Sequence, residues 1–422
     1  MSVSPTPASQ PPSATRAWLV VGMLWFVACS LYVTRNLFVT MHGSLEAAIS
    51  MTEKQFGLLT SVFLWVYACM NPVGGLLADR FNRSVVILAS LLAWSTVTWL
   101  TSYATTFSQL LVLRAIMGLS QACYMPASSA LVTDYHRGPT RSLATGLHMT
   151  GLVCGSALGG GAGWLAERYG WAYAFTLVGL PSLAYGILLL FFLRDAPPEP
   201  GAGPAEGPAE KVRFGPSMLS LITSGSVLAI VAISGLQNAI SWMLIGWMPT
   251  YMREHFSLGQ GAAGFSATGY LAVAQTLSLL ASGFWSDRWS RRSPRARLWV
   301  PVIGLSIAAP GFFLAGHFVF MGSTVVCLCL WGVAVGFMGS NVMPILCLVS
   351  DRRYRASAYA LMNAVGAVAG GLAIYGAGAM RDLKVDLSKG LALAGAAAVA
   401  CAVLFLMIRL KLPAAPALAP SV

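Results

Sequence analysis

Long apolar runs recur along the whole chain, and they constrain its fold more than any other feature. A membrane-spanning helix needs about 20 apolar residues, and reading for runs of about 18 or more predicts twelve such segments. Only 9% of the residues are charged, whereas a soluble domain needs about 25% to cover its surface. The predicted segments are 17–41, 56–78, 84–104, 107–133, 143–165, 171–193, 218–251, 262–286, 298–320, 323–349, 356–380 and 390–412. We therefore expect an all-α membrane protein with twelve transmembrane helices, which excludes a soluble enzyme, a coiled coil and a disordered chain.

A stretch rich in Pro, Gly, Ala and Glu divides these segments into two sets of six. Residues 194–217 lack apolar periodicity, which predicts a linker. We expect an N-terminal six-helix bundle at 17–193 and a C-terminal six-helix bundle at 218–412, related by pseudo-symmetry. The tails, 1–16 and 413–422, are predicted to be cytoplasmic.

The basic residues are distributed unequally between the two sides of the membrane. With a cytoplasmic N-terminus, the inner loops and tails hold 18 of them: Arg16, Arg80, Arg83, Arg137, Arg141, Arg194, Lys211, Arg213, Arg288, Arg291, Arg292, Arg295, Arg297, Arg352, Arg353, Arg355, Arg409 and Lys411. The outer loops hold six: Lys54, Arg168, Arg253, Arg381, Lys384 and Lys389. This asymmetry follows the positive-inside rule and predicts both termini in the cytoplasm. It also accounts for the net charge of +12 without a nucleic-acid partner.

Two basic residues, Arg35 and Arg114, lie within predicted spans, whereas all 14 acidic residues fall in loops, tails or at span ends. A charge inside the membrane is costly and is kept where it faces a cavity or a partner. Two guanidinium groups without a carboxylate favour a site for a carboxylate, phosphate or sulfate. The alternative is that each arginine bonds backbone carbonyls and only holds helices together.

An internal repeat relates the two halves. The pattern G-x-x-[AS]-D-R-x-x-R occurs at 75–83 and again at 283–291, with its aspartates 208 residues apart. Duplicated halves with a substrate path between them are typical of transporters. We expect these loops to form an inner gate in which Asp caps a neighbouring helix and Arg pairs with an acid; the alternative is that their charges serve topology alone. The predicted gating residues are Asp79, Arg80, Arg83, Asp134, Asp287, Arg288 and Arg292.

At these residues the chain resembles the major facilitator superfamily. The loop of Asp79 resembles the family's gating motif, 114–118 its helix 4 motif and the Gly-rich 151–160 its helix 5 motif. Within the superfamily, 79–83, 94–98 and 164–171 are most similar to bacterial Spinster-type carriers. Residues 32–35 and 247–251 are shared with sialin-like anion:cation symporters and with organophosphate antiporters.

Two departures from these relatives concern coupling. The resemblance implies an Asp before the helix 1 arginine and a Glu seven residues after the helix 4 arginine, both as proton carriers. This chain has Thr34 and Gln121 there. The remaining titratable candidate for coupling is His148 in the fifth predicted span, which is equally consistent with a neutral helix contact.

The sequence thus predicts a secondary transporter that moves a small organic anion, such as a sugar acid or a similar carboxylate or phosphate, by alternating access. The alternatives are a Spinster-type lysophospholipid exporter and an anion sensor that does not transport. Arg35 is the leading anchor and Arg114 the second. The expected substrate-binding residues are completed by Tyr32, Thr34, Asn36, Gln121, Tyr124, Asn238, Tyr270 and Asn363, with Gln275 and Asn341 as further lining candidates. Each of these polar side chains is also a candidate for a helix–helix hydrogen bond.

No enzyme, metal or cofactor signature accompanies these residues. The eight cysteines all lie in predicted spans without a ligand spacing, and no nucleotide-binding G-x-x-x-x-G-K-[ST] motif occurs. We expect no cofactor, no metal and no catalytic residue. The expected partners are the anion, the lipid bilayer and, depending on coupling, a proton or a counter-anion. One chain is enough to form the pathway, so we expect a monomer.

Overall fold

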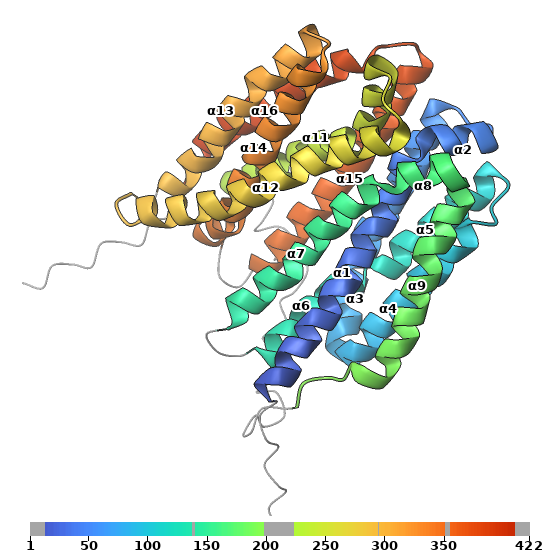
Figure 1. Cartoon of the computed structure of the whole chain (residues 1–422). Coiled ribbons are helices and arrows are strands. Elements are labelled where there is room, and N and C mark those ends of the chain that lie inside the picture. Colours follow the sequence, from blue (N-terminus) through green and yellow to red (C-terminus); the bar gives the residue numbers. More distant parts are fainter. Residues whose placement is uncertain (1–12, 137–139, 198–222, 294, 351–354, 410–422) are drawn as a thin grey trace, which may run out of the picture. The chain divides into compact units, whose positions relative to one another are not determined.

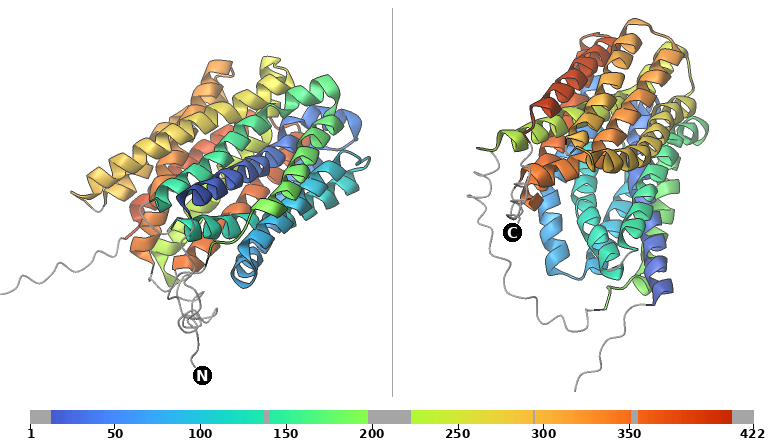
Figure 2. Two further views of the ribbon diagram at one scale, coloured as in Figure 1. Left: turned by 60° about the horizontal axis from the view of Figure 1, so that its bottom comes forward. Right: turned by 90° about the vertical axis from the view of Figure 1, so that its left-hand side faces the viewer.

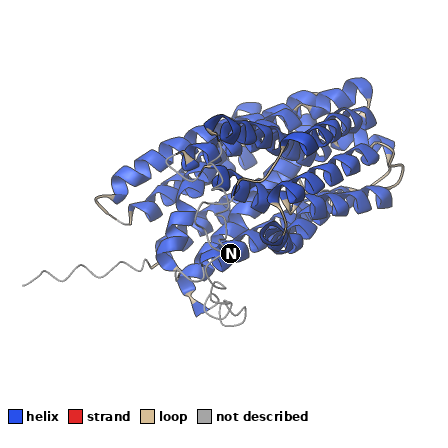
Figure 3. Cartoon of the chain, turned by 90° about the horizontal axis from the view of Figure 1, so that it is seen from below, coloured by secondary structure: helices blue, strands red, loops and turns tan. Residues whose placement is uncertain are grey.

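The computed structural model of the chain describes residues 13–136, 140–197, 223–293, 295–350 and 355–409, and within them it is helical, with no strand (Figures 1 and 3). The side chains of residues 79, 141, 142 and 355–357 are not described. The helices are α1 (Ala14–Thr40), α2 (His42–Ala48), α3 (Glu53–Arg80), α4 (Arg83–Thr101), α5 (Phe107–Gln121), α6 (Tyr124–Tyr135), α7 (Arg141–Gly160), α8 (Ala162–Tyr169), α9 (Trp171–Phe192), α11 (Gly225–Phe256), α12 (Gln260–Ser290), α13 (Ala296–His317), α14 (Met321–Val349), α15 (Arg355–Asp382) and α16 (Leu387–Met407).

Where the structure describes them, the twelve predicted spans each coincide with a helix or a pair of helices, and the predicted span residues 218–222 and 410–412 lie outside the described residues. Among the described residues, ten helical segments are long and apolar enough to cross a membrane, and α5 and α6 count together as one of them. The fifth and eighth predicted spans correspond to α7 and α12, which are less apolar and are not among these ten segments.

Two of the predicted spans are interrupted. The segment predicted at 107–133 ends its first helix at Gln121 and begins α6 at Tyr124. Pro126 lies in the first turn of α6, where a residue without a backbone N–H is tolerated. In the middle of one continuous helix the same proline would remove a backbone hydrogen bond. The predicted 143–165 segment is likewise divided at Gly161 into α7 and α8. The first interruption places Gln121 at a helix end in the middle of a span.

The helices group into two compact units, which are described separately. Unit 1 comprises Met1–Lys211, Trp242–Ala272 and Gly370–Val385. Unit 2 comprises Val212–Ser241, Val273–Ala369 and Asp386–Val422. Helices α11, α12 and α15 each contribute one end to unit 1 and the rest to unit 2.

In unit 1, α1 packs along α7, α3 along α5, and α4 along α9 (Figures 1 and 2). The α1–α7 contact is close because glycines face α1 at every fourth position of α7. A Cβ at Gly151 would lie 2.6 Å from the carbonyl oxygen of Trp25, and a Cβ at Gly159 would lie 2.8 Å from Cβ of Asn36. Small residues at such spacing let two membrane helices approach. The glycine-rich segment therefore allows close packing of α7 against α1.

In unit 2, α13 packs against α14 and α16. A ladder of small polar residues joins α12 to α14. Ser278 donates to the carbonyl of Gly332 at 3.2 Å, and one turn later Ser282 donates to the carbonyl of Gly336 at 3.3 Å. Such short side chains satisfy their hydroxyl groups inside an apolar bundle.

Candidate functional site

Arg35 is buried on α1, with 6% of its surface exposed. Its Nε donates to Oε1 of Gln121 at 2.9 Å. The amide of Gln121 in turn donates from Nε2 to the hydroxyl of Thr34 at 3.0 Å, and this hydroxyl donates to the carbonyl of Leu31 at 2.8 Å. The guanidinium is thus held by a chain of neutral groups, which orients it without neutralising its charge.

Aromatic rings surround the rest of the Arg35 guanidinium. Its central carbon lies 5.0 Å from the ring centre of Tyr32, 5.2 Å from that of Phe63 and 4.7 Å from that of Tyr67. Its Nη2 is buried and has no hydrogen-bond partner among the described residues. An unpaired charged donor inside a protein is unfavourable, so this nitrogen provides a ready hydrogen bond for an incoming anion. We call Arg35, Gln121, Thr34, Tyr32, Phe63 and Tyr67 the arginine site.

Arg114, on α5, lies beside the arginine site but makes different contacts. It is 1% exposed, and its Nε donates to the carbonyl of Leu59 at 3.2 Å. Its guanidinium packs over the rings of Phe38, at 4.3 Å, and Phe63, at 4.9 Å. Phe63 therefore lies against both arginines. No carboxylate pairs with either arginine in the part of the chain that the structure describes.

Two other predicted site residues of unit 1 are used in helix contacts. The amide of Asn36 donates to the carbonyl of Ser156 at 3.1 Å and to its hydroxyl at 2.9 Å, joining α1 to α7. The fully buried hydroxyl of Tyr124 donates to the carbonyl of Leu24 at 2.9 Å and lies 3.0 Å from Nε2 of His148. Since the tyrosine proton is directed to the carbonyl, the imidazole donates from Nε2 in this arrangement. Its Nδ1 then faces no donor among the described residues.

The remaining predicted lining residues are placed as follows. Tyr270 is 43% exposed in the part of α12 that belongs to unit 1. In unit 2, Asn238 donates to the carbonyl of Ser234 at 2.9 Å and Asn363 to that of Tyr359 at 3.1 Å. Asn341 is fully buried and donates to the carbonyl of Phe337 at 2.9 Å, and Gln275 is half-buried. The arginine site itself brings together residues of unit 1 only.

Among the described residues, predicted gating residues form an ion pair in each unit. Arg83 pairs with Asp134 in unit 1. In unit 2, Asp287 accepts from Nη2 of Arg297 at 2.9 Å. Arg297 was not among the predicted gating residues. Arg80 is exposed, and the side chain of Asp79 lies outside the described residues.

A second charged cluster lies at the predicted outer end of unit 1. Arg381 donates to both carboxylate oxygens of Glu254, at 2.7 and 3.0 Å, and to Glu53 at 3.2 Å. The carboxylate of Asp382 accepts from the backbone N–H of Glu53 at 2.9 Å and of Lys54 at 3.1 Å, at the start of α3.

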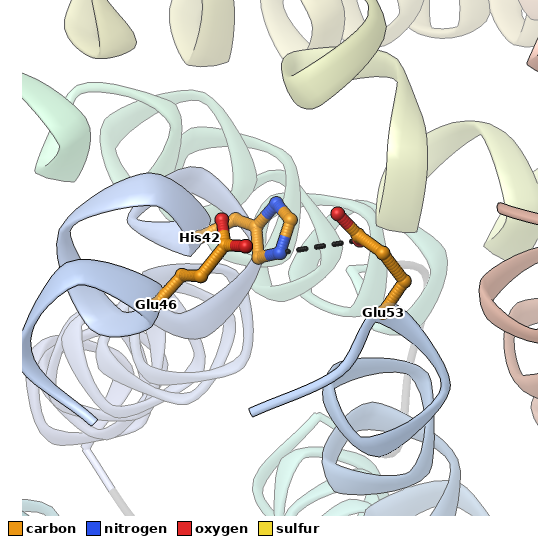
Figure 4. Close-up of side chains that lie close together, drawn as sticks. All are labelled: His42, Glu46 and Glu53. Atoms are coloured by element: carbon orange, nitrogen blue, oxygen red, sulfur yellow. Dashed lines mark ion pairs between the residues drawn. The ribbon is translucent and has the colours of Figure 1, made fainter. Parts of the chain in front are cut away.

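His42, on the short α2, completes this cluster. Its side chain points toward Glu53, with its Nε2 lying 3.4 Å from a carboxylate oxygen of that residue (Figure 4). Its Nδ1 lies 3.0 Å from the hydroxyl of Thr250 on α11. Burial lowers the pKa of His42 to about 3, and the charges of Arg253 and Arg381 add to this effect. We call His42, Glu53, Glu254, Arg381 and Asp382 the outer-end cluster.

The ligand-type atoms of His42, Glu46 and Glu53 lie within 4.8 Å of one another (Figure 4). Two arginines act on the same imidazole, and their repulsion disfavours a metal ion there. One feature of the sequence indicated this cluster, namely acidic residues at the ends of predicted spans beside outer basic residues. Most of its contacts join positions between 127 and 329 residues apart, so spacing along the sequence did not reveal them.

Comparison with known proteins provides an independent measure of relationship. The profile of the Major Facilitator Superfamily matches residues 24–374. An MFS-type efflux pump of Mycolicibacterium smegmatis is 27% identical over 381 residues, which cover 88% of this chain and 86% of the relative. The voltage-gated purine nucleotide uniporter of Rattus norvegicus is 27% identical over 380 residues, covering 83% and 80%.

Among solved structures, a bacterial homolog to the human lysosomal transporter Spinster, in an inward-facing and unoccupied conformation, is similar with a TM-score of 0.74. It is 20% identical, and the match covers 94% of this chain and 95% of that one. At this identity the likeness shows the fold.

Proposed function

The chain belongs to the major facilitator superfamily and is a multi-pass membrane transporter, and we propose that it carries a small organic anion by alternating access. The substrate class is a carboxylate or phosphate of about the size of a sugar acid. We further propose that it resides in a bacterial-type inner membrane as a monomer with both termini in the cytoplasm. The observation that carries the proposal is Arg35, a buried cation with an unpartnered Nη2.

An anion completes the arginine site in a way that no neutral substrate does. Gln121 occupies Nε of Arg35, so a carboxylate or phosphate oxygen accepts from the free Nη2. The bond between a guanidinium and an anionic oxygen is charge-assisted and stronger than a neutral hydrogen bond. The aromatic rings around Arg35 leave few groups for water to bind, which strengthens the attraction. Arg114 contributes a second positive charge nearby, while its own hydrogen bonds go to the carbonyl of Leu59 and the sulfur of Met117.

The neutral groups beside Arg35 also bear on coupling. Gln121, which bonds to Arg35, and Thr34, which bonds to Gln121, do not take up a proton in the physiological range. Neither of these two groups therefore gains or loses charge during transport. We propose that the carrier works as an anion exchanger or an anion uniporter. The inside-negative potential, about 2.3 kcal/mol per charge per 100 mV, then drives an unexchanged anion outward. The purine nucleotide uniporter among the relatives supports this mode.

Thermal stabilisation by ligands tests the substrate class without any assumption on coupling, because a ligand that binds the folded state raises its melting temperature. The panel is hexuronates, aldonates, sialic acid, sugar phosphates and lysophospholipids, with Arg35→Ala and Arg35→Lys beside the wild type. We expect a sugar acid or phosphate to stabilise the wild type and to bind Arg35→Ala about tenfold to hundredfold more weakly, as for loss of a charged hydrogen bond.

The matched control is Arg168→Ala, which removes an exposed arginine that stacks on Trp164 and Tyr169 of α8. Unchanged affinity in a folded Arg35→Ala protein would refute the anchor. Stabilisation by lysophospholipid alone would favour a lipid exporter. Binding without counterflow in proteoliposomes would favour a sensor.

A further inference from the structure

The end of α12 carries a cavity that the transport site does not use. Its volume is about 450 Å³, and it is lined by Trp285, Arg288, Trp289, Arg291 and Arg292. These five residues, the tryptophan–arginine pocket, lie in the last six residues of α12 and in the two residues that follow its end at Ser290. Trp285 and Trp289 stack with ring centres 5.7 Å apart and an angle of 16° between the planes. The pocket thus has an aromatic wall beside three guanidinium groups.

The three arginines of this pocket have no acidic partner among the described residues. The nearest acid in the sequence, Asp287, already pairs with Arg297 at 2.9 Å. Arginine does not lose its proton in proteins, so three like charges remain together at the rim of one cavity. Such an arrangement is stabilised by an anion that binds several guanidinium groups at once.

The position of the pocket selects the kind of anion. It lies where α12 ends, six residues before α13 begins a helix that can span a membrane. By the charge asymmetry of the loops, this is the cytoplasmic surface, where anionic lipid headgroups are abundant. Tryptophan favours this interfacial depth, because its ring is apolar and its N–H is polar. A phospholipid offers both a phosphate for the arginines and an apolar body for the indoles.

We propose that the tryptophan–arginine pocket binds the headgroup of an anionic phospholipid such as phosphatidylglycerol. The phosphate accepts from the guanidinium groups, and the glycerol and upper acyl region pack on Trp285 and Trp289. Topology alone would require the positive charges but no cavity with stacked indoles. The bound lipid reinforces the end of unit 2 that holds the Asp287–Arg297 ion pair. The proposal is independent of the transported substrate, and it uses the proposed orientation only to name the leaflet.

Lipid retention measured by native mass spectrometry tests this site on the full-length protein. The wild type is purified from vesicles of phosphatidylcholine mixed with phosphatidylglycerol, beside the triple variant Arg288→Gln/Arg291→Gln/Arg292→Gln. Each basic residue near an anionic surface contributes on the order of a fivefold change in binding. We expect the wild type to retain phosphatidylglycerol over phosphatidylcholine and the triple variant to lose this preference by at least about tenfold.

The matched control removes the same charge elsewhere on the predicted cytoplasmic side. The variant Arg16→Gln/Arg194→Gln/Arg409→Gln replaces three exposed arginines that lie outside the pocket, and it should keep the preference. Equal losses in both triple variants would overturn the proposal, since net charge alone would then explain retention. So would a wild type without preference.

A charge-conserving variant tests the aromatic wall. Trp289→Leu should reduce phosphatidylglycerol retention, whereas Trp299→Leu, at an exposed tryptophan near the start of α13, should not. Melting temperatures in phosphatidylcholine alone report whether each variant is folded. Inorganic phosphate is added in a parallel series; if it displaces the lipid at low concentration, the pocket is a site for free phosphate and the lipid assignment is wrong.

Discussion

The arginine site and the outer-end cluster include residues only seven positions apart on the chain, Arg35 and His42. They differ in whether their arginine is paired with carboxylates. Arg35 has neutral hydrogen-bond partners and an unpartnered nitrogen. Arg381 is bound by two carboxylates, and Asp382 next to it caps a helix. A cluster whose charges are already compensated gains little from a ligand, whereas an uncompensated cation needs one. We infer from this contrast that the outer-end cluster stabilises the fold and that the arginine site binds the substrate.

Gln121→Glu removes this difference most directly, because it places a carboxylate against Arg35. The Gln121 side chain lies 2.9 Å from Nε of Arg35, so a glutamate there competes with the anionic substrate. We expect substrate affinity to fall by about 2–3 kcal/mol, roughly a hundredfold, at neutral pH. Acidification should restore part of it as the new carboxyl protonates, and transport should become dependent on pH.

Gln109→Glu is the matched control for that change. It adds the same charge to the first turn of α5, where the side chain takes part in a capping box that Glu also forms. Binding isotherms at several pH values distinguish the two variants. If Gln121→Glu binds like the wild type at neutral pH, the arginine site does not hold the anion.

The outer-end cluster should respond to Arg381→Gln through stability instead of affinity. The variant leaves the carboxylates of Glu53 and Glu254 together without their shared cation. Removing one partner of a buried ion pair costs about 3–5 kcal/mol, and partial exposure of Glu254 reduces this to about 2 kcal/mol. Thermal unfolding measures the loss. The double variant Arg381→Gln/Glu53→Gln should recover part of it, and failure to do so would contradict the role of carboxylate repulsion.

The arginine site and the outer-end cluster also differ in how far the sequence predicted them. The fold class was predicted from apolar runs and charge asymmetry, and it is confirmed by the family match and the structural similarity. The roles of Arg35, Thr34 and Gln121 remain predictions, although the three side chains do meet. Rarity of charge inside spans was enough to single out Arg35.

The neighbours of each site residue could not be predicted, because they depend on side-chain direction and on contacts between residues far apart in the sequence. Tyr67 and Phe63 lie on α3 and looked like ordinary apolar span residues. For Asn36 and Tyr124 the sequence left open a lining role or a helix–helix hydrogen bond, and both side chains bond to neighbouring helices. Helical spacing gives the face of a residue on its own helix, but it does not say which helix covers that face.

The pH dependence of stability tests the contribution of His42 to the outer-end cluster. Its pKa is about 3 in the folded protein and 6.5 in the unfolded chain. Between pH 6.5 and pH 3 the imidazole of His42 binds a proton in the unfolded chain but not in the folded protein. Protonation therefore does not favour unfolding above pH 6.5, and it lowers the free energy of unfolding progressively as the pH falls toward 3. We expect a loss of about 1.4 kcal/mol per pH unit below 6.5 relative to His42→Gln, measured by chemical unfolding in detergent. Parallel stability curves for the two proteins would show that the imidazole is already accessible to water.

Asp382→Asn should have the smallest effect, and it separates hydrogen bonding from charge in the outer-end cluster. The carboxylate accepts from two backbone N–H groups at the start of α3, and its negative charge also favours that position through the helix dipole. Asparagine keeps one acceptor oxygen and removes the charge, so we expect a loss of about 0.5–1 kcal/mol of unfolding free energy. Substrate affinity should not change, because the arginine site shares no contact with Asp382 among the described residues. A fall in affinity that matches the fall in stability would mean that the two clusters act as one unit. Separate roles for the outer-end cluster in stability and for the arginine site in binding would then be wrong.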